Sequence, residues 1–219
     1  MFRHLMFVCS AAALLAGPAA AESATPKLHP VEKACVTYDL GGQMQSGTLT
    51  RCHRDFAYET YEIQNVSIGF GGFSQTQTSH TITVGDTIYN VDTKAKTATK
   101  TDNPMYDSLV SALQNSSAED MGSAFLDAMG MTSTGTTKTV AGETCTVYSS
   151  QMMGQACLSS DWLMLEQTVM GMTQTATSVS RDTGGDDANY TLYQTVSVSN
   201  GPDLSNLPGG LAGIFGNGN

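Results

Sequence analysis

Apolar and polar residues alternate over short stretches along most of the chain, a pattern typical of β-strands with one buried face. Thr81–Val84 and Thr87–Val91 are such stretches, and Gly85-Asp86 separates them. Glycine at the first position of a two-residue turn suits a type II′ hairpin, so we predict a hairpin here. A second turn at Asp92–Ala95 leads into a further predicted strand at Lys96–Lys100.

Three more stretches are predicted to be strands, although their patterns differ. In Phe56–Ile63 the alternation slips at Tyr61, which predicts a β-bulge. Thr168–Ser180 is rich in β-branched residues, and Thr191–Val198 alternates as a half-buried strand does. The polar segment Asp182–Ala188 is predicted to be the turn that joins these last two strands.

Between Pro104 and Gly130 the apolar period changes to that of a helix. Apolar residues recur at helical spacing in two runs: Tyr106, Leu109, Val110 and Leu113, then Met121, Ala124, Phe125, Ala128 and Met129. Ser116 with Glu119 has the spacing of a capping box, and Gly130 is the expected C-terminal cap. The apolar faces of both helices need a partner, most simply one face of the sheet. We therefore predict an α+β fold that is mainly antiparallel β, with a two-helix insert at 104–130.

The first residues have the pattern of an export signal. Arg3 precedes an apolar run at Leu5–Gly17, and Ala19-Ala20-Ala21 supplies the small residues of a cleavage site. We predict a signal peptide at 1–21 with cleavage after Ala21, and the run is too short to span a bilayer. The protein is therefore expected in a Gram-negative periplasm or outside the cell, with no integral membrane segment after cleavage.

The remainder of the chain is predicted to form one domain with two extensions. A chain of 219 residues is long enough for a single domain, which we place at 34–200. The segment at 22–33 contains Pro26 and Pro30 and is expected to be extended. A glycine-rich tail follows at 201–219.

Four cysteines remain once Cys9, inside the apolar run, is set aside: Cys35, Cys52, Cys145 and Cys157. An even number of cysteines in an exported chain indicates disulfides. The first two flank a predicted hairpin centred near Gly41-Gly42, and the last two flank a turn at Ser149–Gly154. We therefore predict the pairs Cys35–Cys52 and Cys145–Cys157. No C-x-x-C motif occurs, which disfavours redox or metal chemistry at these residues.

Several strand and turn phrases resemble a known superfamily. They are Tyr38–Leu40, Gly47–Thr50, Ile82–Asp92, Thr139–Tyr148, Cys157–Trp162 and Leu204–Pro208. In this layout the chain is similar to the lipoprotein-localisation-factor (LolA/LolB-like) superfamily, as one of its uncharacterised periplasmic relatives. The resemblance implies an unclosed antiparallel β half-barrel whose concave face is covered by helices. In the characterised carriers of that superfamily, the resulting cup holds lipoprotein acyl chains.

Charge and motifs exclude several classes of function. The chain has 10 basic and 20 acidic side chains, a net charge of -10, and no basic run. This disfavours nucleic acid as a partner, because such binding depends on neutralising phosphates. The sequence contains no G-x-S-x-G, P-loop, H-E-x-x-H or G-x-G-x-x-G motif. We therefore expect a non-enzymatic protein without cofactor, catalytic residue or metal, and interpret His29, His53 and His80 as surface or turn residues.

Methionine is the most informative residue type for function. Eight methionines lie in or beside the predicted helices and the strands that would face them: Met121, Met129, Met131, Met152, Met153, Met164, Met170 and Met172. Methionine is flexible and polarizable, so it can line an adaptable apolar cavity, but it also fills ordinary cores. Its thioether is a ligand for Cu(I) as well.

The favoured hypothesis is an exported protein that holds a hydrophobic ligand, such as a lipid, an acyl chain or an apolar peptide. The predicted cavity residues are Tyr106, Leu109, Leu113, Met121, Phe125, Met129, Trp162 and Met164. The alternative is an envelope structural or interaction protein with a filled core, an envelope protein as partner and no ligand. A methionine-rich Cu(I) chaperone is the third hypothesis.

Overall fold

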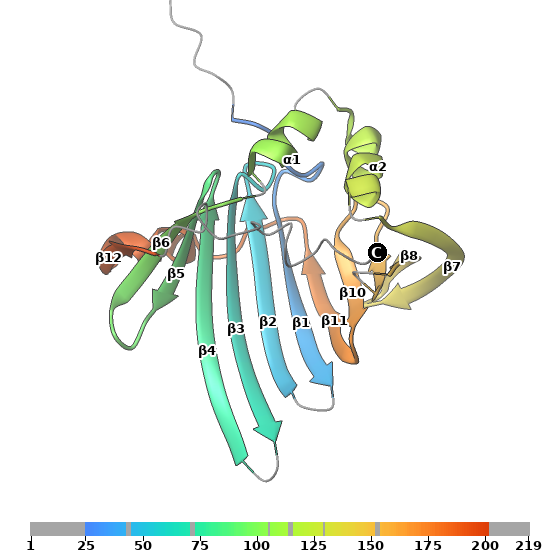
Figure 1. Cartoon of the computed structure of the whole chain (residues 1–219). Coiled ribbons are helices and arrows are strands. Elements are labelled where there is room, and N and C mark those ends of the chain that lie inside the picture. Colours follow the sequence, from blue (N-terminus) through green and yellow to red (C-terminus); the bar gives the residue numbers. More distant parts are fainter. Residues whose placement is uncertain are drawn as a thin grey trace, which may run out of the picture.

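The computed structural model describes residues 25–42, 45–70, 73–104, 106–113, 116–128, 130–151 and 154–201. Within these ranges the chain forms one open, 12-stranded sheet of order β12-β6-β5-β4-β3-β2-β1-β11-β10-β9-β8-β7 (Figure 1). All neighbouring strands are antiparallel except β12 and β6, which pair in parallel. The mainly antiparallel β fold with an inserted helix pair is thus confirmed. The predicted signal peptide and nearly all of the glycine-rich tail lie outside the described residues.

The bounds of the elements are as follows. The strands are β1 (Ala34–Gly42), β2 (Gln45–Arg54), β3 (Glu59–Phe70), β4 (Phe73–Val84), β5 (Thr87–Asp92), β6 (Thr97–Asp102), β7 (Thr132–Val140), β8 (Glu143–Ser150), β9 (Gly154–Leu158), β10 (Met164–Val169), β11 (Met172–Ser180) and β12 (Ser197–Asn200). The helices are α1 (Tyr106–Leu113), α2 (Ala118–Ala128), α3 (Asp187–Thr191) and the single 3-10 turn η1 (Leu192–Thr195).

The sheet is covered on both faces near the end where β1 begins and β2 ends. On one face the side chains of Val36 and Tyr38 are buried, in a cluster that also contains Leu163 and Leu165. Side chains alternate between the two faces of a strand, so the neighbours of Val36 and Tyr38 along β1 point to the opposite face of the sheet. There Cys52, Tyr61, Ile82, Val91 and Ala98 pack against Tyr190 of α3. Helices α1 and α2 lie beyond this end of the long strands (Figure 1).

The helix boundaries follow local signals. Helix α2 begins with a capping box formed by Ser117 and Asp120: the Asp120 N–H donates to Ser117 Oγ at 3.1 Å, and Asp120 Oδ2 accepts from the Ser117 N–H at 3.3 Å. The predicted box at Ser116 and Glu119 is therefore wrong by one residue. At the other end Gly130 has φ +58, and the Met131 N–H donates to the Leu126 carbonyl at 2.8 Å. This Schellman motif confirms Gly130 as the C-terminal cap.

The predicted hairpin of β4 and β5 is confirmed, whereas the strand predicted at Phe56–Ile63 starts too early. Asp55, Phe56 and Ala57 have φ of 50, 55 and 64, so the chain turns there and β3 begins at Glu59. The backbone of Phe56 bonds instead to the N-terminal segment, where its carbonyl accepts from Leu28 N–H at 2.9 Å. The predicted bulge at Tyr61 is wrong as well, because the β2–β3 register is continuous through that residue.

The last two predicted strands also differ from the structure. Thr168–Ser180 is two strands, β10 and β11, because Met170 and Gly171 both have positive φ, 50 and 78, as a type I′ turn requires. Thr191–Val198 is mostly helical, and only its end belongs to β12. A helix forms here because a capping residue precedes it, within the predicted turn at Asp182–Ala188. The Asp186 carboxylate accepts from the Ala188 N–H at 3.0 Å and caps α3.

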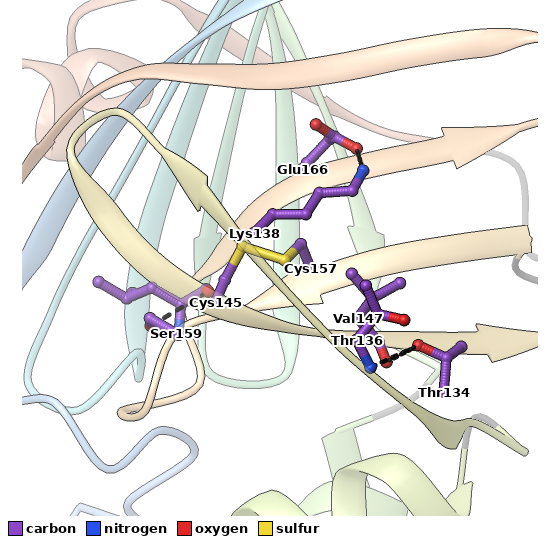
Figure 2. The surroundings of a disulfide bond; sticks show 9 residues. Thr134, Thr136, Lys138, Cys145, Val147, Cys157, Ser159 and Glu166 are labelled. Atoms are coloured by element: carbon purple, nitrogen blue, oxygen red, sulfur yellow. Dashed lines mark hydrogen bonds and ion pairs between the residues drawn. A yellow bond between two sulfur atoms is a disulfide. The ribbon is translucent and has the colours of Figure 1, made fainter.

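Both predicted disulfides are confirmed. Cys35 and Cys52 are directly opposite in the β1–β2 ladder, with Cα atoms 4.1 Å apart. Cys145 and Cys157 connect β8 and β9 with Cα atoms 5.4 Å apart, and Figure 2 shows this bond beside the Lys138–Glu166 ion pair. Two disulfides indicate that the chain folds in an oxidising compartment rather than in the cytosol.

Candidate functional site

A cavity of about 300 Å³ lies between α1, α2, the N-terminal segment and the covered end of the sheet. Its apolar lining is Leu28, Pro30, Val36, Ala57, Leu109, Leu113, Met121, Gly122, Met131, Ala156, Leu158, Trp162, Leu163 and Met164. Its polar lining is His29, Tyr38, Arg51, His53, Thr60 and Gln167. Residues more than one hundred positions apart in the sequence therefore share one apolar space, as in ligand pockets of many proteins.

The structure brings five of the eight predicted cavity residues together around this space: Leu109, Leu113, Met121, Trp162 and Met164. Tyr106 is half-buried at the start of α1 and lies outside the lining, beside Tyr58 and Asp86. The side chains of Phe125 and Met129 lie outside the described part of the chain.

Trp162, in the loop between β9 and β10, packs against Gly122 of α2. A methyl group built on Gly122 would overlap the indole at Cδ2, Cε2 and Cζ2, so only glycine allows α2 to approach this closely. The backbone of Trp162 is in the left-handed region, with φ 69, which is a strained conformation for a bulky residue. Ser159 holds the loop in this shape, since its N–H donates to the Leu163 carbonyl and its Oγ accepts from the Leu163 N–H, both at 2.9 Å.

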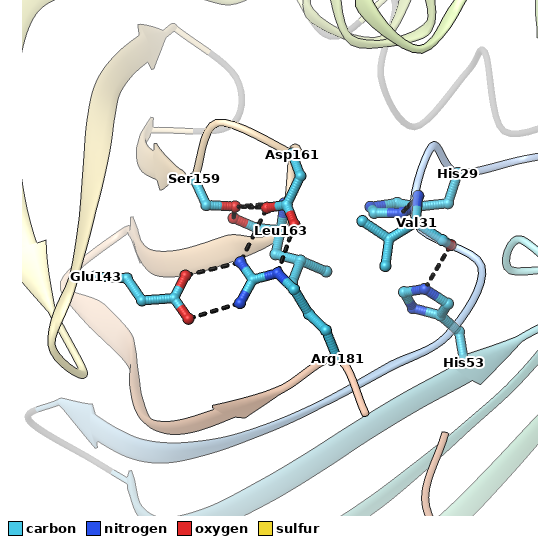
Figure 3. A network of polar contacts seen from close by, with 8 residues as sticks. All are labelled: His29, Val31, His53, Glu143, Ser159, Asp161, Leu163 and Arg181. Carbon is cyan, nitrogen blue, oxygen red and sulfur yellow. Dashed lines mark hydrogen bonds and ion pairs between the residues drawn. The ribbon is translucent and has the colours of Figure 1, made fainter. Parts of the chain in front are cut away.

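An arginine between two carboxylates fixes the same loop (Figure 3). Arg181 donates to Asp161 at 2.5 and 3.0 Å and to Glu143 at 2.6 and 2.7 Å, so both pairs are bidentate. Burial opposes the ionisation of Asp161, but hydrogen bonds from Arg181 and Ser159 outweigh it and lower its pKa to about 2. The hydrogen bonds to Asp161 and Glu143 in turn raise the pKa of Arg181. The cluster holds Asp161 in place and, with it, the adjacent Trp162.

His29 and His53 line the cavity, a role that the sequence did not predict. The interpretation of His53 and His80 as surface or turn residues is wrong, because they are only 7% and 5% exposed. The rings of His29 and His53 lie 4.7 Å apart, and Val31 joins them (Figure 3): its N–H donates to His29 Nδ1 and its carbonyl accepts from His53 Nε2, each at 3.1 Å. Burial, helped by the neighbouring His29, lowers the pKa of His53 to about 4. Burial also lowers the pKa of His29, so both imidazoles are uncharged at neutral pH.

Arg51 is the permanently charged residue of the described cavity lining. Its Nε donates to Glu62 Oε1 at 2.5 Å, and its guanidinium carbon lies 5.8 Å from the centre of the Tyr38 ring. The Tyr38 hydroxyl donates to the Met164 carbonyl at 2.8 Å, which connects β1 to β10 across the cavity wall. Burial disfavours the charge of Arg51, but Glu62 and Tyr38 raise its pKa, so it stays protonated.

A second hollow, of about 270 Å³, is polar and lies by α3 on the other face. Arg54 in its wall is bound to Glu59 and Asp187 at 2.6 and 2.7 Å, so its charge is already compensated. Within the described ranges no group of three or more His, Cys, Asp or Glu could hold a metal ion. No helix in this part of the chain is long and apolar enough to cross a membrane.

Comparisons with known proteins give distant matches among solved structures. No protein-family model and no curated protein sequence matches the chain. Among solved structures it is similar to an uncharacterised conserved protein from Thermus thermophilus, with 10% sequence identity and a TM-score of 0.47. The match covers 78% of this chain and 91% of that one. No family match connects the chain to the lipoprotein-localisation factors.

Proposed function

We propose that the protein is a non-enzymatic, exported binding protein that holds one small hydrophobic ligand between the sheet and the helices α1 and α2. The observation that carries this proposal is the cavity of about 300 Å³ with its largely apolar lining. This volume is about twice that of an engineered cavity of ~150 Å³ that holds one benzene molecule. It also lies at the lower end of ligand pockets, at roughly 300–1,000 Å³. The occupant is therefore one short chain or ring system, not a bundle of acyl chains.

The wall of the cavity has the chemistry of a hydrophobic binding site. Leu109 and Leu113 of α1 and Met121 of α2 supply its helical side, and Met131 and Met164 supply more thioether surface. Methionine side chains adapt their shape at little energetic cost, so such a wall accommodates related apolar ligands of different outline.

The proposal includes the compartment in which the protein folds and binds its ligand. A signal peptide at 1–21 directs the chain out of the cytosol, to the periplasm or outside the cell, where the two disulfides form in an oxidising environment. An open, curved sheet with helices at one end supports an unclosed β architecture, and its assignment to the half-barrel of the LolA/LolB-like superfamily is part of the proposal. Within that architecture the ligand occupies the cup beneath the helices.

Native mass spectrometry tests the proposal on protein exported with its own leader and collected from a bacterial periplasm. The wild type is expected to carry one apolar ligand. Met121→Lys, which places a charge in the cavity wall, is expected to lose it. Met170→Lys is the matched control, because Met170 is 93% exposed in the β10–β11 turn and should leave the ligand bound.

Three results would reject the proposal. A ligand-free mass in repeated preparations, together with no thermal stabilisation by added apolar ligands, would favour an envelope protein with a filled core. A copper adduct in place of the ligand would favour the Cu(I) chaperone. Equal ligand retention by Met121→Lys and the wild type would place the ligand elsewhere.

A further inference from the structure

The charges around the cavity differ from those of the chain as a whole. The chain has 20 acidic and 10 basic side chains, yet none of the described residues that line the cavity is Asp or Glu. The lining contains Arg51, and the two histidines beside it are neutral at pH 7. The charged group on the wall of the apolar cavity is therefore Arg51, whose partner Glu62 lies outside the lining.

We propose that the ligand is an amphiphile with a single carboxylate, whose chain lies among the apolar residues of α1, α2 and Trp162 and whose head binds Arg51. This inference rests on the proposed function, since it assigns a chemical class to the ligand of the same cavity.

The geometry of Arg51 suits a carboxylate. Glu62 accepts from Nε, and the Tyr38 hydroxyl also interacts with the guanidinium, so further N–H donors of the two terminal NH₂ groups remain for another acceptor. A planar carboxylate matches the spacing of two guanidinium N–H donors and can bind both at once. The Arg51 side chain is 35% exposed and lines the cavity.

Other head groups fit less well. A quaternary ammonium would find no carboxylate in the described lining and would be repelled by Arg51. A phosphate dianion would bring two negative charges against Glu62, which already lies 2.5 Å from Arg51 Nε. A neutral alcohol fills the apolar space equally well but gains only a neutral hydrogen bond, which is weaker than one between charged partners.

The size of the cavity limits the chain. If ~150 Å³ holds the six carbons of benzene, then a cavity of about 300 Å³ holds on the order of twelve heavy atoms. Decanoate, a saturated monocarboxylate, has that size and is the appropriate probe. Decanol and decyltrimethylammonium keep the same chain and change only the head group.

Trp162 provides the readout, because it is the single tryptophan of the chain and lines the cavity. We would titrate full-length mature protein with each probe below its micellar concentration and follow the indole emission. Decanoate is expected to bind about tenfold tighter than decanol, or more, as a charge-assisted hydrogen bond contributes. Decyltrimethylammonium is expected to bind weakest. Added salt is expected to weaken decanoate binding and to leave decanol binding unchanged.

Arg51→Gln should weaken decanoate about tenfold and leave decanol unchanged. Arg54→Gln is the matched control, because Arg54 lies on the same strand but outside the cavity, bound to Glu59. If Arg51→Gln fails to fold, Arg51→Lys retains the charge and the wild-type comparison of the probes still decides. Equal or tighter binding of decanol, or an equal loss of both probes in Arg51→Gln, would overturn the head-group assignment alone. Failure of every probe to bind the wild type would instead reject the proposed function.

Discussion

The contact between Gly122 and Trp162 gives the sharpest prediction about how the cavity is built. Gly122→Ala adds a methyl group that overlaps three atoms of the indole, so the indole must rotate or α2 must move away. Overpacking of this kind costs about 1–3 kcal/mol. The same substitution improves the helix propensity of α2 by about 1 kcal/mol. We therefore expect a net destabilisation of roughly 0–2 kcal/mol in the wild-type background.

In a Trp162→Ala background the clash is absent and only the gain in helix propensity remains. Gly122→Ala is then expected to stabilise the fold by about 1 kcal/mol. The pair should therefore show a coupling energy of roughly 1–3 kcal/mol in a double-mutant cycle. Urea unfolding followed by far-ultraviolet circular dichroism measures all four proteins without relying on tryptophan emission. The same stability change from Gly122→Ala in both backgrounds would refute the contact, and with it the position of α2 over the cavity.

Three further predictions concern the groups that hold the site. Asp161 has a folded pKa of about 2, below its ordinary 3.8, so its stabilisation is present above pH 4 and disappears as the pH falls to 2. Asp161→Asn should destabilise the protein by about 2 kcal/mol at pH 7 and much less at pH 2, as measured by urea unfolding at each pH. His53 has a folded pKa of about 4, below its ordinary 6.5, so unfolded chains take up the proton first as the pH falls. Stability should decrease by up to about 3 kcal/mol between pH 6.5 and 4, and His53→Gln should remove that part of the slope. Replacing Cys145 and Cys157 by serine should lower the free energy of unfolding by about 3 kcal/mol, and an unchanged urea midpoint would contradict this.

Features with strong local signals could be predicted from the sequence. Gly85 at a two-residue turn and Gly130 after a helical stripe each act through a backbone conformation that glycine adopts readily. The two disulfides followed from hairpin geometry. Thr191–Val198 differs from its predicted strand because Leu192 and Val196 satisfy a period of four as well as alternation, and the cap at Asp186 favours the helix.

The candidate site could be predicted only on its helical side. The apolar stripes containing Leu109, Leu113 and Met121 required a partner surface, so their place in a cavity could be argued from spacing. Arg51 and His53 carried no such signal, because their role depends on the N-terminal segment and the neighbouring strands packing around them. Contacts between residues far apart in the sequence produce no pattern among neighbouring residues, so they could not be predicted from it.

In the proposed complex a medium-chain hydrophobic ligand lies against Trp162 in the cavity. Quenching of the Trp162 emission by a decanoate brominated on its chain tests this directly, because bromine quenches the indole only at close contact. Saturable quenching with one ligand per chain is expected, and it should be lost in Met121→Lys and retained in Met170→Lys. Quenching that never saturates, or that is the same in both variants, would contradict this placement of the ligand.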